Sequence, residues 1–152
     1  MPEKIEDVIQ KRGFVVTPTK GTSMYPLIKS NCDNVCIARA DTISVYDVAL
    51  YKRKNGDYVL HRILGKNDNG YILCGDNQWV LEYNVTEDMI LGKLDAWYVG
   101  EKEYTVRDKH YKRYVKLWCK SLKLRRIMLF ILSLKWRTKS LCYKVYKKVF
   151  RK

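Results

Sequence analysis

The feature that most constrains the fold of this chain is the tripeptide Lys54-Asn55-Gly56, which separates two apolar runs, residues 45–52 and 57–64. Asn-Gly between alternating apolar runs is the strongest short-range signal for a β-hairpin, because both residues accept the left-handed backbone of a tight turn. We therefore expect an antiparallel hairpin near the middle of the chain.

Other segments extend this hairpin into a sheet. Residues 3–12 are expected to form a short helix that stops at Gly13, since glycine commonly ends helices. Apolar and β-branched residues predict further strands at residues 14–17, 34–39, 71–74 and 89–99. Several short strands at this spacing predict a mainly β domain, built as a small sandwich or barrel.

Charge is distributed unevenly along the 152 residues. Residues 107–152 hold 17 of the 30 Lys and Arg but only one of the 16 Asp and Glu, which gives this segment a net charge of +16. Residues 1–106 hold 13 basic and 15 acidic side chains, a net charge of −2. We therefore expect a β domain over residues 1–106 and a basic helical tail over residues 107–152.

The tail has the periodicity of amphipathic helices. Tyr111, Tyr114 and Trp118 recur at helical spacing, with basic residues on the opposite face. Lys- and Arg-rich helices with aromatic side chains suit an anionic membrane surface. The candidate membrane contacts are Lys112, Arg113, Lys116, Trp118, Lys120, Lys123, Arg125 and Arg126. Membrane binding is favoured over two alternatives, packing of the helices on the β domain and attraction of nucleic acid.

The sequence predicts neither a disulfide framework nor a membrane span. The five cysteines are odd in number and form no Cys-X-X-Cys pair, and Cys32 and Cys36 have poor spacing for a zinc site. The charged first twelve residues are unlike a signal peptide, and the apolar run Ile127–Leu134 is too short to span a membrane. We expect no metal or cofactor, and a cytoplasmic protein that at most binds the membrane peripherally.

Residues 21–26 read Gly-Thr-Ser-Met-Tyr-Pro and predict a tight loop. Gly21 permits unusual dihedral angles, while Pro26 fixes its own φ and pushes Tyr25 towards an extended conformation. A serine presented on such a loop can act as a nucleophile when a base lies close to it. The alternative is that Ser23 is an ordinary turn residue that bonds its own backbone.

Later residues could supply a base and a carboxylate. His61 shares one face of its predicted strand with Val59 and Ile63, and partly apolar surroundings would keep its imidazole neutral and able to accept a proton. The alternative for His61 is a hydrogen-bonded core histidine. Asp76 and Glu82 are rival carboxylates for orienting the imidazole, although Asp76 could instead bond its own turn.

Four motifs, in chain order, resemble the boxes of type I signal peptidases and their LexA-like relatives. They are Gly-Thr-Ser-Met-Tyr-Pro, Tyr-Asp-Val-Ala-Leu-Tyr at residues 46–51, His-Arg-Ile at residues 61–63 and Gly-Asp-Asn at residues 75–77. The resemblance covers residues 14–99. It implies a β-rich peptidase fold with Ser23 as nucleophile and the substrate extended beside the active-site strand. Most bacterial members have a lysine base, so a histidine is similar to the archaeal and endoplasmic-reticulum type and implies His61 as the base.

The resemblance also bears on the carboxylate and the oxyanion hole. In the histidine type the carboxylate is assigned to the second acidic position of this region, which is Glu82 here when the count starts at Asp76, so Asp76 and Glu82 remain rivals. Gly21 stands where bacterial signal peptidases have an oxyanion-hole serine, so the Ser23 N–H would serve, with Thr22 as a candidate second donor. The candidate substrate contacts beside the nucleophile are Met24, Tyr25 and Pro26.

These observations together predict a serine endopeptidase that cleaves a polypeptide, either a precursor or a leader peptide, through an acyl-enzyme. One alternative is a catalytically inactive relative that docks on a membrane or on nucleic acid through its basic tail. A self-cleaving LexA-like regulator is disfavoured, because no recognisable helix-turn-helix precedes the β domain and the lysine base is absent.

Overall fold

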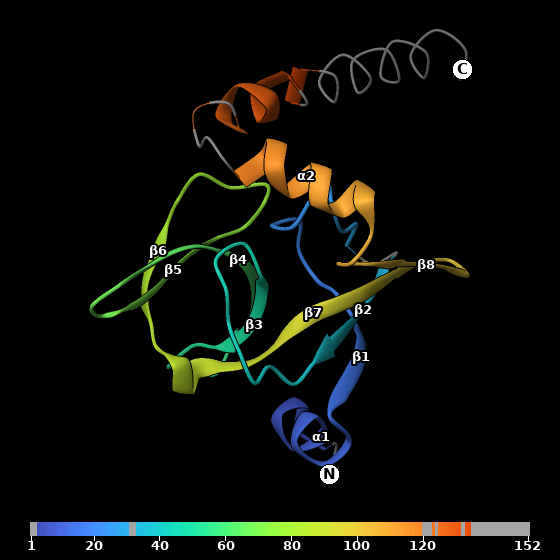
Figure 1. Ribbon diagram of the computed structural model, residues 1–152, viewed down its shortest axis with the longest axis vertical. Helices are drawn as coiled ribbons and strands as arrows, with labels where there is room; N and C mark the ends of the chain where they lie inside the picture. Colours follow the sequence, from blue (N-terminus) through green and yellow to red (C-terminus); the bar gives the residue numbers. More distant parts are fainter. Residues whose placement is uncertain (1–2, 31–32, 120–122, 124, 132, 135–152) are drawn as a thin grey trace, which may run out of the picture.

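The computed structural model describes residues 3–30, 33–119, 123, 125–131 and 133–134 (Figure 1). In chain order the elements are α1 (Ile5–Arg12), β1 (Phe14–Pro18), β2 (Asp33–Ala38), β3 (Val48–Lys52), β4 (Tyr58–Asn67), β5 (Gly70–Cys74), β6 (Glu82–Val85), the 3₁₀ turn η1 (Glu87–Met89), β7 (Ile90–Val99), β8 (Lys102–Thr105) and α2 (Lys109–Cys119). The eight strands form one sheet with antiparallel pairing throughout. The predicted mainly β class is therefore confirmed.

The sheet follows the order β1-β2-β7-β3-β4-β5-β6 and bends strongly along its length (Figure 1). The long strand β7 pairs with β2 along one edge, and with β3 and then β8 along the other. This arrangement leaves β1 and β6 as the two ends of the main strand order. The sequence predicted neither β6 nor β8, because each has only four residues and a largely polar composition.

The predicted hairpin is confirmed as β3 and β4. Its register places Ala49 opposite His61, so Tyr51 lies diagonally across from His61 on the same face of the sheet. The first strand begins at Val48 rather than at residue 45, because Tyr46 adopts a left-handed backbone with φ of 79° in the preceding turn.

Two of the three apolar clusters among the described residues form the core of the sheet, and the third, Trp118, Cys119 and Leu129, lies in the tail. The larger cluster joins α1, the β1-β2-β7 part of the sheet and α2, and includes Ile9, Ile37 and Tyr111. The smaller cluster lies between β3, β4 and β5 and includes Tyr51 and Leu73. The smaller cluster therefore packs against β4, the strand that carries His61.

Both ends of the domain are closed by helices (Figure 1). The predicted stop of α1 at Gly13 is confirmed, since this residue is left-handed and its N–H donates to Ile9 O at 2.9 Å. At the opposite end, α2 buries Tyr111 against the sheet and Trp118 against Leu129 and the turn that carries Asp76. The expected division after residue 106 therefore separates residues that share one core, because Tyr111 belongs to the same cluster as Trp97.

Candidate active site

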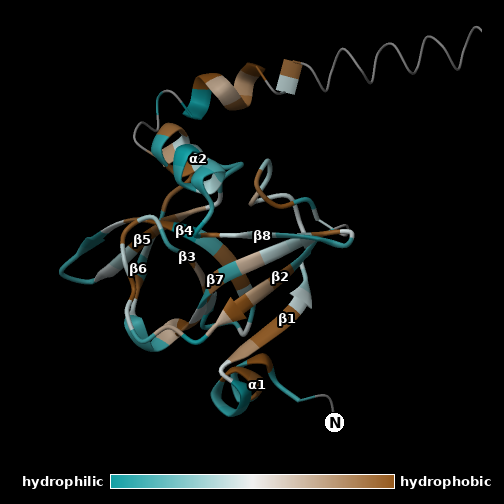
Figure 2. Cartoon of the chain, turned by 45° about the vertical axis from the view of Figure 1, so that its right-hand side comes forward, coloured by the Kyte–Doolittle hydropathy of each residue, from teal (hydrophilic) through white to brown (hydrophobic). Residues whose placement is uncertain are grey.

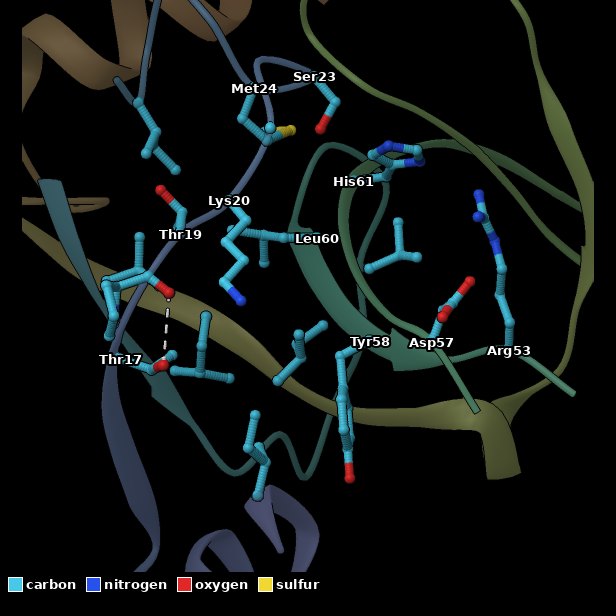
Figure 3. Close-up of a pocket in the computed structure, with 18 of the residues that line it drawn as sticks. Thr17, Thr19, Lys20, Ser23, Met24, Arg53, Asp57, Tyr58, Leu60 and His61 are labelled. Carbon is cyan, nitrogen blue, oxygen red and sulfur yellow. Dashed lines mark hydrogen bonds between the residues drawn. The ribbon is translucent and has the colours of Figure 1, made fainter. Parts of the chain in front are cut away.

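A cavity of about 750 Å³ lies beside Ser23 and His61 (Figure 3). Its walls come from the end of β1 and the following loop, from the start of β4 and from the core beneath them. Figure 3 shows Ser23 and His61 towards the same end of this cavity, with Lys20 and Tyr58 further along it. The fold thus brings two residues that are distant in sequence to one concave surface.

The Ser23 loop is held from both sides. Met24 and Ile28 are buried in the larger core cluster and anchor the loop from below. The N–H of Asn77 donates a 2.7 Å hydrogen bond to Ser23 O and fixes the loop from the other side. Gly75 lies so close that a Cβ atom there would stand 2.7 Å from Ser23 O. The Gly-Asp-Asn motif therefore determines where Ser23 lies.

The backbone around Ser23 offers donors for an oxyanion. Within the described residues, the N–H groups of Thr22 and Ser23 donate no hydrogen bond; Ser23 lines the cavity, whereas Thr22 does not. The Thr22 carbonyl is occupied, because it accepts from Tyr25 N–H at 3.1 Å. In the same described part of the chain no hydrogen bond joins Ser23 Oγ to His61, although the two side chains border one cavity.

His61 lies on β4 and is only 6% exposed. Its Nδ1 is 3.3 Å from the hydroxyl oxygen of Tyr51, which is fully buried on β3. Burial lowers the pKa of His61 below its ordinary value of 6.5, an effect that the Glu82 carboxylate partly opposes. The imidazole is therefore neutral near pH 7, which is the state that a general base needs.

Glu82, at the start of β6, is the carboxylate near His61. Its Oε2 lies 3.8 Å from His61 Nδ1 and accepts a 2.6 Å hydrogen bond from Tyr51. Arg53 binds both oxygens of Glu82, at 2.9 and 2.6 Å. The hydrogen bonds from Arg53 hold the pKa of Glu82 below its ordinary value despite partial burial, and the hydrogen bond from Tyr51 adds to this effect. Glu82 is thus ionised and fixed beside the Tyr51–His61 pair.

The expectation that Asp76 could orient His61 is not met. Asp76 is fully buried, and both of its oxygens receive the Arg62 guanidinium, at 2.8 and 2.6 Å. Tyr114 and Arg125 also donate to its carboxylate, at 2.9 and 3.0 Å, and Trp118 donates to its backbone oxygen at 2.8 Å. The carboxylate therefore joins the β domain to the tail.

The three candidate substrate contacts have different positions. Met24 borders the cavity, but it is 5% exposed and belongs to the core, so it forms part of the cavity floor. Tyr25 and Pro26 are half-buried and are not among the residues that line the cavity. The structure instead puts the loop before Ser23, including Thr19 and Lys20, along the cavity wall (Figure 3).

The candidate membrane contacts of the tail divide into two groups. Trp118 and Arg125 are 3% and 1% exposed, so the expectation that they face a membrane is wrong; both contact Asp76. Helical periodicity indicates which residues share a face, but not which surface covers that face. The exposed members of the set are Lys112, Arg113, Lys116, Lys123 and Arg126. Lys120, like the zinc candidate Cys32, lies outside the described residues.

Sequence reasoning missed the partners of His61 and Glu82, which are Tyr51 and Arg53. The hairpin pattern could have indicated them, because the length of the turn determines which residues of β3 lie beside His61.

No helix among the described residues is both long and apolar enough to span a membrane. Comparisons with protein-family models, with curated proteins and with solved structures find no match to this chain, so its function is inferred from the geometry of the site.

Proposed function

We propose that this chain is a serine endopeptidase in which Ser23 is the nucleophile and His61 is the general base. The observation that carries the proposal is that both side chains border one end of the same cavity, with the second ring nitrogen of His61 directed at a hydroxyl. Hydrogen bonds between a nucleophile and its base are commonly long in unliganded sites and shorten when substrate binds. The absence of a Ser23–His61 bond in the described chain is compatible with this behaviour.

The proposed reaction is acyl transfer. Ser23 Oγ attacks the scissile carbonyl while His61 Nε2 takes the hydroxyl proton, and the Ser23 N–H, with Thr22 as the candidate second donor, would stabilise the developing oxyanion. His61 then passes the proton to the leaving amine, and water hydrolyses the acyl-enzyme by the same route. Every group that these steps need lies on the Ser23 loop or on β4.

The substrate we propose is an extended segment of a precursor or leader polypeptide. In the described sheet β1 pairs only with β2, and residues 58–60 of β4 pair only with β3, so each presents an unpaired edge. Both segments line the cavity. Unpaired edges bind extended peptides by adding them as a further strand. This geometry supports a fold of the signal-peptidase and LexA-like type, which the order of the four motifs resembles.

An active-site-directed fluorophosphonate tests the proposal without knowledge of the substrate. Ser23 Oγ would form a bond to phosphorus as the P–F bond breaks, fluoride leaves and His61 accepts the hydroxyl proton. Intact-mass and peptide analysis should locate one adduct on Ser23, and S23A and H61A should lose it. The exposed residues Ser44 and His110 give matched controls, because S44A and H110A should label at the wild-type rate. An adduct that persists in S23A, or equal rates for H61A and H110A, would exclude the assignment.

A second proposal concerns the tail, which we propose binds an anionic membrane surface. The described helical residues after α2 present an exposed surface in which two basic side chains, Lys123 and Arg126, are followed by mainly apolar ones (Figure 2). Its apolar members are strongly exposed: Ile127 is 56%, Phe130 is 61% and Ile131 is 48% exposed. Leu117 on α2 is 61% exposed and lies next to Lys116. Exposed apolar side chains among basic ones favour an anionic lipid surface over nucleic acid, which needs no aliphatic contact.

Vesicle sedimentation distinguishes these partners. Wild-type protein should bind phosphatidylcholine vesicles that contain phosphatidylserine more strongly than pure phosphatidylcholine, and the double variant F130S/I131S should lose most of this binding. The matched control is F14S/V16S, which removes two exposed apolar residues of β1 at the opposite end of the molecule. If the tail variant binds as well as wild type, or if it affects RNA and vesicle binding equally, the membrane proposal is wrong.

A further inference from the structure

The contacts of His61 Nδ1 differ from those of a simple histidine–carboxylate pair. The carboxylate of Glu82 is 3.8 Å from His61 Nδ1, which is beyond hydrogen-bonding distance. The Tyr51 hydroxyl lies between the two groups, 3.3 Å from the nitrogen and 2.6 Å from the carboxylate. We propose that Tyr51 is a positioning residue that selects the His61 tautomer with a proton on Nδ1 and a free lone pair on Nε2. This inference rests on the proposed role of His61 as a base.

The hydroxyl of Tyr51 has one proton, and its geometry determines where that proton goes. Glu82 is ionised and accepts only, so the 2.6 Å contact requires Tyr51 to donate to it. The oxygen of Tyr51 then has only lone pairs left for His61. A lone pair at 3.3 Å from Nδ1 is satisfied only when Nδ1 carries a proton, which leaves Nε2 unprotonated.

The position of Glu82 is fixed independently of His61. Arg53 binds both carboxylate oxygens, and this pairing keeps Glu82 ionised. Burial raises the pKa of Tyr51 strongly, and its hydrogen bond to Glu82 raises it further, so the tyrosine proton stays on oxygen throughout the working pH range. The Arg53–Glu82 pair therefore fixes the direction in which the Tyr51 O–H points.

The same groups would stabilise the imidazolium that forms when His61 accepts the serine proton. The protonated Nδ1–H still points at the Tyr51 oxygen, and the negative charge of Glu82 is only 3.8 Å away. Three other charged groups affect the pKa of His61. Arg53, in the hairpin turn, and Arg125 lower this pKa, whereas Asp76 raises it. Tyr51 thus connects His61 to the Glu82 carboxylate through its hydroxyl and keeps its own proton.

The decisive variant is Tyr51→Phe, which keeps the buried ring and removes only the hydroxyl. Tyr71→Phe is the matched control: Tyr71 lies on β5, is 4% exposed and donates to Glu87 at 2.8 Å, and among the described residues it has no hydrogen bond to His61. In Y51F we expect the neutral ring to shift towards the Nε2–H tautomer, because Nδ1–H would face a ring carbon. The fluorophosphonate rate at pH 7.5 should fall by about tenfold or more, and Y71F should match wild type.

Nitrogen-15 NMR of the histidine ring gives a readout that does not depend on activity. Spectra of the full chain, assigned with H110A, should show His61 with a protonated Nδ1 and an unprotonated Nε2 above its pKa. Y51F should change this pattern and lower the pH at which the ring protonates, and E82Q should also lower that pH. Unchanged ring shifts and an unchanged rate profile in Y51F would overturn the inference.

Should Y51F fail to fold, as judged by circular dichroism, E82Q tests the same link. A wild-type protein with the expected ring pattern but no Ser23 adduct would instead reject the peptidase proposal and leave Tyr51 as the orienting group.

Discussion

The N–H of Asn77 donates to the carbonyl oxygen of Ser23 at 2.7 Å, so the turn that carries Asp76 also holds the candidate nucleophile. Asp76 is in turn bound by Arg125 from the tail and by Arg62 from β4. A continuous set of contacts therefore runs from the tail to the Ser23 loop. The consequences of this connection can be measured one residue at a time.

Asp76→Asn should destabilise the protein by about 3–5 kcal/mol, because it leaves the buried guanidinium groups of Arg62 and Arg125 without their counter-charge. Urea unfolding followed by circular dichroism measures the change. The matched control is Asp95→Asn, which breaks the exposed pair with Arg107 and should cost less than about 1 kcal/mol. Similar losses for the two variants would mean that the Asp76 ion pairs contribute no more than a surface pair.

Gly75→Ala should slow the labelling of Ser23, because the new methyl group would stand 2.7 Å from Ser23 O and 2.8 Å from Gln78 Oε1. Either the Ser23 loop or the turn must shift, at a cost of about 1–3 kcal/mol in the free energy of unfolding. The fluorophosphonate rate and the melting temperature report the two effects. Gly65→Ala on β4 is the control, since its nearest atom is 3.9 Å away and labelling should be unaffected. Wild-type rates in G75A would show that this close approach does not position the nucleophile.

Truncation after Arg107 should destabilise the β domain. From charge distribution alone, such a chain is expected to remain folded and soluble. The structure changes this expectation, because the truncation removes Tyr111 and Trp118 from buried positions and takes Tyr114 and Arg125 from the Asp76 carboxylate. Thermal unfolding of the shortened chain should begin at a lower temperature than that of the full chain. Equal melting temperatures would indicate a tail that is independent of the domain.

The stability of the folded chain should decrease as the pH falls below about 6.5. Burial lowers the pKa of His61, so between the folded and unfolded pKa values the unfolded state binds more protons and is favoured. The contribution of neutral His61 to the free energy of unfolding is therefore complete above pH 6.5, and it is lost as the pH falls towards the pKa of His61 in the folded state. Urea unfolding at pH 7.5 and at pH 5.5 gives two free energies of unfolding. The difference between them should be smaller for His61→Gln than for wild type. His110→Gln is the comparison variant, because His110 is the other histidine of the chain and is exposed. A wild-type pH dependence in H61Q would contradict this account.

The central hairpin, the helix stop at Gly13 and most strands could be predicted from the sequence, because short-range turn and capping chemistry determines them. β6 could not, since Glu82–Val85 has few residues and is held by pairing with β5 rather than by its own pattern. Its first residue is nevertheless the carboxylate nearest to His61. The choice between Asp76 and Glu82 thus depended on a strand that local pattern does not reveal.

The tail shows a different limit of sequence reasoning. Its basic charge placed Arg125 among the candidate membrane contacts, yet Arg125 is buried against Asp76. Burial of an arginine is favourable only where a distant part of the chain supplies a carboxylate, and that partner lies 49 positions earlier. Periodicity correctly grouped Tyr111, Tyr114 and Trp118 on one helix face. It could not indicate that an acidic group lies beneath them.

The five-residue connection between β3 and β4 has a role beyond reversing the chain. Its length sets the register that puts Tyr51 diagonally across from His61, and its first residue, Arg53, holds Glu82. Side chains alternate between the two faces of a strand, so a one-residue insertion between Asn55 and Gly56 that shifts β4 would turn His61 towards the other face. Such a protein would retain every candidate catalytic side chain in its sequence and still lose the site. For this fold, the length of one loop is as much a requirement for chemistry as the identity of the nucleophile.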